Sequence, residues 1–186
     1  MEAQSDFLII VIPIIFIVII YLIACRSKGG KSNMTNLENP TKFSRLPIVT
    51  ITANNILLDE NMKLTEQARS ALVTLAKKAS IFIFILVKDQ EEVNRISDSM
   101  VQEFSGLVDK EQILYTQTEE GRASMSRQLE PAAHIDFDPE VVRLTSIFIP
   151  TAFIAPMSVE SQYSKWHATS VGALINGNNE FINSLK

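Results

Sequence analysis

Residues 81–87 read Ile-Phe-Ile-Phe-Ile-Leu-Val, seven apolar side chains without a break. A strand with one face in water alternates apolar and polar residues, whereas a strand covered on both faces has no polar position. The stretch therefore predicts a central strand of a parallel sheet with helices packed on both of its faces.

Strand and helix signals alternate around this run. Residues 47–58 begin with β-branched side chains, which favour a strand. Thr65 is placed to cap a helix whose apolar residues recur on one face. Asp89 is placed to cap the next helix, which ends at Gly106. Residues 112–116 then follow as a third strand.

The second half of the chain continues the alternation with weaker signals. A short, poorly patterned helix is expected at 122–129. A short strand is expected at 134–137, although the alanines that precede it are untypical of a buried strand. Asp138 before Pro139 is a strong helix start. That helix is expected to end near Phe148, and residues 151–155 form another strand. The following segment has no clear pattern until a short helix at the C-terminus, 179–186. This order predicts a Rossmann-like three-layer α/β sandwich with a mainly parallel sheet.

One segment near the N-terminus stands apart from this domain. Of the 19 residues 7–25, 18 are apolar and none is charged. As a helix, Phe7 to Ala24 would rise about 27 Å, close to the thickness of the hydrocarbon core of a bilayer. Basic residues follow the segment and none precedes it, which argues against a cleaved signal peptide and places the C-terminal bulk in the cytosol.

Four regions are therefore expected along the chain. They are a short non-cytosolic N-terminus (1–6), a transmembrane helix (7–25), a polar linker (26–45) and a cytosolic α/β domain (46–186). The formal net charge of -4 offers no basic surplus for nucleic acid. Cys25 is the single cysteine, so neither an internal disulfide nor a thiol nucleophile within the domain is available. Lipidation of Cys25 at the membrane edge stays open.

The best candidate for enzyme chemistry is the pair Asp136 and Asp138. Carboxylates at positions i and i+2 after a strand can bind Mg²⁺, as in aspartate-dependent phosphatases. The alternative function is thus a membrane-anchored, Mg-dependent, phosphatase-like hydrolase. Asp138, however, already has a role as a helix cap. No dinucleotide-binding, zinc-protease or serine-hydrolase motif occurs, so no cofactor is expected.

Four aromatic and histidine positions outside this pair have two interpretations each. His134 and His167 are expected to pack or to lie on the surface rather than form a site. Tyr163 and Trp166 stand three residues apart, as in a partner-binding stripe, but core packing is the stronger interpretation.

A series of short motifs resembles the peroxin-22 family. They are G-R-x-S at 121–124, R-Q-L-E-P at 127–131, H-I-D at 134–136 and D-P-E at 138–140. A looser similarity extends to residues 49–57, and the order of one span, a linker and an α/β domain also matches. Ala132 and Ala133 depart from the family, which usually has an acidic and an aromatic residue there.

The resemblance implies a non-catalytic adaptor of the peroxisomal membrane, with its N-terminus in the matrix and its domain in the cytosol. The implied partner is a ubiquitin-conjugating enzyme of the peroxin class, which ubiquitinates an import receptor for recycling. The adaptor would either only tether the enzyme or both tether and stimulate it, and both possibilities stay open. No small-molecule substrate is expected. The motif residues proposed to bind the partner are Arg127, Gln128, Glu130, His134 and Asp136. An equal alternative is that these residues stabilise the fold.

Overall fold

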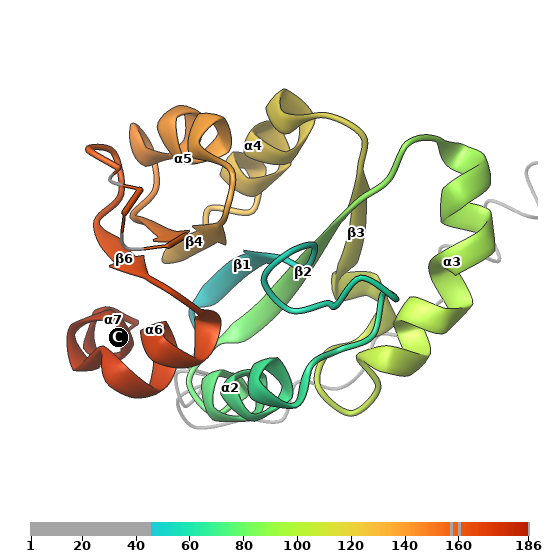
Figure 1. Cartoon of the computed structure of the whole chain (residues 1–186), viewed down its shortest axis with the longest axis horizontal. Helices are drawn as coiled ribbons and strands as arrows, with labels where there is room; N and C mark the ends of the chain where they lie inside the picture. The colour runs from blue at the N-terminus through green and yellow to red at the C-terminus, as the bar shows by residue number, and fades with distance from the viewer. Residues whose placement is uncertain (1–45, 157, 160, 186) are drawn as a thin grey trace, which may run out of the picture. The chain divides into compact units, whose positions relative to one another are not determined.

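A single sheet organises the residues that the computed structural model describes, which are 46–156, 158–159 and 161–185. Six parallel strands lie in the order β3-β2-β1-β4-β5-β6 (Figure 1). They are β1 (Ile48–Thr52), β2 (Ser80–Leu86), β3 (Ile113–Thr116), β4 (Ala133–Asp136), β5 (Thr151–Ile154) and β6 (Trp166–Ala168). The predicted parallel α/β sheet is confirmed, and all but the last residue of the run 81–87 lie in β2, which has a neighbour on both sides.

Helices cover both faces of this sheet. They are α2 (Glu66–Ala76), α3 (Gln90–Glu103), α4 (Glu119–Gln128), α5 (Pro139–Ser146), α6 (Val171–Gly177) and α7 (Asn179–Ser184), with a short 3₁₀ helix η1 (Lys110–Gln112) before β3. Helices α2, α6 and α7 lie together on one face, and α4 and α5 lie together on the other (Figure 1).

The direction in which the chain winds reverses at β1. From β1 the chain proceeds to β2 and β3, then crosses to β4 on the other side of β1 and continues to β5 and β6. The connections that leave β1 and β4 therefore diverge. In open α/β sheets, this switch point at the carboxyl ends of the strands is where ligands usually bind.

The two faces of the sheet differ in chemistry because side chains alternate along each strand. Toward α2 and α6 the interior is apolar, with one cluster that includes Val49, Ile51, Leu72, Leu75, Ile135 and Leu174. Toward α4 and α5 the same strands turn polar side chains, and all of them are buried: Thr50, Thr52, His134, Asp136 and Thr151. The domain thus has an apolar core on one face and a polar layer on the other.

The predicted helix starts agree with the structure. The side chain of Thr65 accepts a hydrogen bond from the amide of Ala68, and Asp89 accepts one from the amide of Glu92. Asp138 caps α5 with Pro139 in its first turn. Such caps satisfy amides that have no partner within the helix.

Three parts of the C-terminal half differ from the prediction. Helix α4 begins at Glu119, three residues before the expected start, because Thr118 caps it. Strand β4 is completely buried despite its alanine and polar residues. Strand β6 and helix α6 were not predicted; β6 has only three residues, too few to show an alternating pattern.

The predicted N-terminal segment 1–6, transmembrane helix 7–25 and linker 26–45 lie outside the described residues. Within the described part of the chain, no helix combines the length and the hydropathy needed to cross a membrane.

Candidate functional site

The switch point between β1 and β4 brings four side chains together. Thr52 ends β1, His134 and Asp136 lie on β4, and Arg122 reaches in from α4. Each of the four is completely buried. The site where a ligand would normally enter the fold is therefore filled by the side chains of the chain itself.

Asp136 lies at the centre of this cluster. Its Oδ2 atom accepts a hydrogen bond from the Thr52 hydroxyl at 2.6 Å, and it lies 2.9 Å from Arg122 Nε and 3.2 Å from His134 Nε2. Its Oδ1 atom accepts a hydrogen bond from the amide of Asp138 at 2.9 Å. Three of these contacts are made by Oδ2 and one by Oδ1, so each oxygen of Asp136 has at least one partner within the fold.

These contacts also set the charge of Asp136. Burial raises the pKa of this carboxyl, but the hydrogen bond and charge of His134, the charge of Arg122 and the Thr52 hydroxyl outweigh burial and hold it below the ordinary 3.8. Asp136 is therefore an anion at neutral pH. A general acid would need a raised pKa instead.

Arg122 connects both aspartates. Its Nη2 atom lies 3.5 Å from Asp138 Oδ2, and its guanidinium lies 5.6 Å from the centre of the Phe137 ring. The Oδ1 atom of Asp138 accepts from the amides of Glu140 and Val141 as the cap of α5. The position that a metal ion would need between the two carboxylates thus holds a guanidinium. No cluster of three metal-ligating side chains occurs in the part of the chain that the structure describes.

The polar layer continues away from Asp136 toward the start of the strands. The Thr50 hydroxyl lies 2.8 Å from His134 Nδ1 and 3.1 Å from the hydroxyl of Ser126 on α4. His134 also packs edge-on against the Phe84 ring. The expectation that His134 packs within the fold is confirmed, and its ring connects β1 to β4 and to Asp136.

A second set of hydrogen bonds joins the segment after β1 to the end of β2. The side-chain amide of Asn54, just after β1, donates to the carbonyl of Leu86 at 3.3 Å, and its oxygen accepts from the amide of Leu86 at 2.7 Å. Backbone after β1 is thereby fixed to the end of β2. The region after β1 is occupied by structural contacts on both sides.

The proposed partner-binding residues separate into two groups. Arg127, Gln128 and Glu130 are exposed at the end of α4 and in the turn that follows. His134 and Asp136 are completely buried, so their side chains offer no surface to a partner in this structure. All five residues were proposed because they belong to the motifs of the resemblance, and a motif does not show which of its side chains are exposed.

Sequence reasoning did not single out Arg122 as a site residue. Arginine is almost never fully buried unless it is paired, and its pairing partner on β4 is 14 positions away in the chain. The only signal was its place in the G-R-x-S motif. In the structure, Arg122 neutralises Asp136 and Asp138, the two residues that the sequence had suggested as Mg²⁺ ligands.

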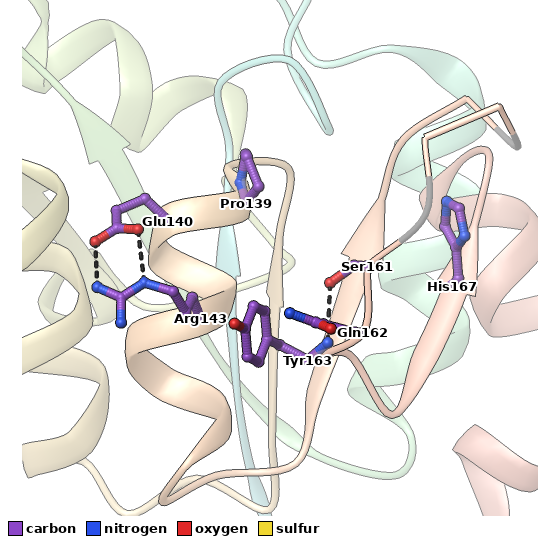
Figure 2. A pocket seen from close by; sticks show the side chains of 7 residues that line it. All are labelled: Pro139, Glu140, Arg143, Ser161, Gln162, Tyr163 and His167. Carbon is purple, nitrogen blue, oxygen red and sulfur yellow. Dashed lines mark hydrogen bonds and ion pairs between the residues drawn. The ribbon is translucent and has the colours of Figure 1, made fainter.

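A large hollow lies elsewhere, between α5 and the connection from β5 to β6. It has a volume of about 680 Å³ and is lined by Pro139, Glu140, Arg143, Ser161, Gln162, Tyr163 and His167 (Figure 2). Glu140 and Arg143 turn toward each other and form two hydrogen bonds of 2.8 and 2.6 Å. His167 Nε2 lies 3.2 Å from the carbonyl oxygen of Ala155. Glu140 and Arg143 of this hollow thus pair with each other, and the His167 ring meets the backbone.

Trp166 and Tyr163 do not form the partner-binding stripe that their spacing suggested. Trp166 is buried and packs edge-on against Phe181 at 5.1 Å. Tyr163 remains exposed beside α5. Core packing, the stronger interpretation, holds for Trp166.

The fold is similar to that of a haloacid dehalogenase-like protein. A crystal structure from Burkholderia xenovorans LB400, described as a haloacid dehalogenase-like hydrolase, superposes with a TM-score of 0.54. The two share 10% sequence identity, and the match covers 74% of this chain and 99% of the other. At this identity the likeness concerns the fold alone.

The sequence comparison identifies the family. The family model for Peroxisome biogenesis protein 22, haloacid dehydrogenase-like domain, matches residues 49–175, and the chain belongs to this family. A relative named Peroxisome biogenesis protein 22 from Arabidopsis thaliana is 34% identical over 82 residues. That match covers 42% of this chain and 29% of the relative. The peroxin-22 resemblance is confirmed, and with it a role in peroxisome biogenesis.

Proposed function

We propose that this chain is a membrane adaptor that tethers a ubiquitin-conjugating peroxin to the cytosolic face of the peroxisome. In this proposal, residues 1–6 face the matrix, 7–25 span the membrane, 26–45 form a linker and 46–186 form the cytosolic domain. The enzyme so held ubiquitinates an import receptor and permits its recycling. Membership of the Peroxisome biogenesis protein 22 family is the observation that carries this proposal.

The filled switch point supports an adaptor over a hydrolase. An Mg-dependent hydrolase would need Asp136 and Asp138 free to bind the ion and attack a substrate. In this fold the Asp136 carboxylate meets Thr52, Arg122, His134 and a backbone amide. Freeing this carboxylate for a metal ion would leave the buried guanidinium of Arg122 without its partner, which is strongly unfavourable.

Tethering acts through local concentration and needs no catalytic group. A flexible linker of 20 residues has a root-mean-square span of about 25 Å. The domain and its partner would thus stay within a thin layer beside the membrane, where a membrane-bound receptor also lies. Such confinement raises the effective concentration of enzyme relative to substrate.

Arg127, Gln128 and Glu130 are the proposed contacts with the enzyme. All three side chains are exposed. Arg127 Cζ lies 5.0 Å from the centre of the Phe148 ring, which holds the guanidinium in place at the surface. Arginine ordered in this way is typical of residues that contribute strongly to protein interfaces.

Calorimetric titration of the full chain in lipid nanodiscs with the ubiquitin-conjugating peroxin of the same organism tests the proposal. We expect saturable one-to-one binding with a dissociation constant below about 1 μM, or roughly -8 kcal/mol. The triple variant R127A/Q128A/E130A should weaken binding. The variant K110A/E111A, which changes an exposed pair before β3, is the matched control.

Absence of binding by a folded chain would argue against the adaptor function. The same preparation should then be assayed for Mg-dependent hydrolysis of phosphate esters. Activity that D136N abolishes would favour the hydrolase alternative.

A further inference from the structure

Two neighbouring apolar side chains project from the end of α5. Ile147 is 72% exposed and Phe148 is 63% exposed, the highest values among the exposed large apolar residues of the described chain. We name this pair the α5 tip. Leaving two such side chains in water forgoes the gain from burying them, and neighbouring exposed apolar residues commonly mark an interaction site.

Cationic and amphipathic side chains surround the α5 tip. Arg127 lies over the Phe148 ring. A hollow of about 280 Å³ beside the tip is lined by Pro150, Tyr163 and Lys165, and no carboxylate lines it. Tyr163 is 45% exposed, and the Lys165 ammonium lies 4.6 Å from the centre of the Trp166 ring. Apolar side chains flanked by Tyr, Lys and Arg match the composition of protein surfaces at a membrane interface.

The α5 tip lies at the edge of the sheet where the strands begin. Backbone hydrogen bonds link the starts of three strands there: Ala132 donates to Ile48, and His134 donates to Pro150. Leu46, two residues before β1, belongs to this edge and is 47% exposed. The chain therefore enters the domain on the side that carries the α5 tip. Only 20 residues separate Leu46 from the apolar segment 7–25.

We propose that the α5 tip inserts into the headgroup layer of the membrane to which the chain is anchored. Ile147 and Phe148 would enter the interface, while Lys165 would meet lipid phosphates. This inference rests on the proposed anchoring by residues 7–25. Its consequence is that the domain lies on the membrane in one orientation, with the switch-point edge turned away.

Charge favours this orientation over the others. Residues 46–186 contain 18 Asp and Glu against 12 Lys and Arg, so an anionic membrane repels the domain as a whole. The hollow beside the α5 tip has no carboxylate in its lining and contains Lys165, so that repulsion is weaker there. A protein partner would also fit an apolar pair with arginine, but it would not require the pair to lie on the edge where the chain enters.

The test uses the full chain reconstituted in vesicles of phosphatidylcholine and phosphatidylserine. In a C25S background, an environment-sensitive fluorophore is attached at S146C, beside the α5 tip, or at S99C on α3, which lies on the other side of the domain (Figure 1). Lipids brominated on their acyl chains quench a fluorophore that enters the interface. Flotation of the vesicles reports anchoring separately.

We expect severalfold stronger quenching at position 146 than at position 99. The double variant I147S/F148S should reduce quenching at 146 to the level at 99, whereas V73S, which changes an exposed apolar residue on α2, should not. Circular dichroism checks that each variant is folded. The single variant I147S, which leaves Phe148 in contact with Arg127, should also reduce quenching at 146 and should still bind the ubiquitin-conjugating peroxin.

Equal quenching at both positions in a chain that floats with the vesicles would overturn the inference and leave the anchor intact. Loss of peroxin binding in I147S would assign the α5 tip to the protein partner and would also overturn the inference. A chain that does not float at all would remove the anchor, and the inference with it.

Discussion

Arg122 and Asp136 form an ion pair from which water is excluded, with 2.9 Å between Nε and Oδ2 and both side chains completely buried. The pair joins α4 to β4 across the polar face of the sheet. Buried pairs of this kind contribute little compared with apolar packing, but they are costly to break on one side only. The pair therefore makes the helix and the strand dependent on each other.

Replacing Asp136 by alanine should strongly destabilise the domain. D136A leaves Arg122 charged and without its main partner, and we expect a loss of about 3–5 kcal/mol in the free energy of unfolding. Urea denaturation followed by circular dichroism measures this. The double variant R122M/D136L should recover much of the loss, because no unpaired charge remains. A midpoint for D136A equal to that of R143A, which breaks an exposed pair, would contradict the prediction.

Stability should fall in acid through Asp136. Although burial raises the pKa of this carboxyl, His134, Arg122 and Thr52 hold it below 3.8 in the folded chain. As the pH falls, the unfolded chain therefore takes up a proton at this carboxyl before the folded chain does. The contribution of the Asp136 carboxylate to folding stability is complete above pH 3.8. It is lost as the pH falls below that value through the pKa of the folded chain. The difference in unfolding free energy between wild type and D136A should accordingly narrow in that range. A constant difference would show that another group controls acid unfolding.

Asp138 should act as a helix cap and not as a metal ligand. D138A removes the acceptor for two amides of α5 and should cost about 1 kcal/mol, whereas D138S keeps a capping oxygen and should cost less. Millimolar Mg²⁺ should leave the unfolding midpoint of the wild type unchanged. A midpoint that rises with Mg²⁺ in wild type but not in D138S would instead indicate a metal site.

Gly106 should be required for its backbone conformation alone. Its φ is +77°, and a Cβ atom added there would meet no atom within 4 Å. G106A should therefore cost about 1 kcal/mol through backbone strain without any steric clash. G177A, at the end of α6, has equal space and no positive φ, and should be neutral or slightly stabilising. Equal effects of the two substitutions in thermal unfolding would contradict this explanation.

Most of the architecture could be predicted from the sequence because its signals are local. The apolar run in β2 indicated an interior strand, and Thr65, Asp89 and Asp138 marked helix starts through their own side chains. Strand β6 could not be predicted, since three residues show no period and its place depends on pairing with β5.

The polar layer could not be predicted because it is a long-range property. Thr50 and His134 are 84 residues apart, and so are Thr52 and Asp136. Separately, each is an ordinary polar residue whose default place is the surface. Their burial follows only from the strand order, which puts β1 beside β4. For the same reason, Arg122 gave no sign that it would neutralise Asp136.

Because the polar layer is buried, the motifs in residues 121–140 indicate a shared internal structure among relatives of this chain. Arg122, His134 and Asp136 belong to those motifs, and their contacts are all internal. A distant sequence that keeps them will therefore share the way β1, β4 and α4 are joined, whatever protein it meets. Divergence in partner choice should instead be recorded at the exposed residues Arg127, Gln128 and Glu130, where substitutions leave the interior untouched.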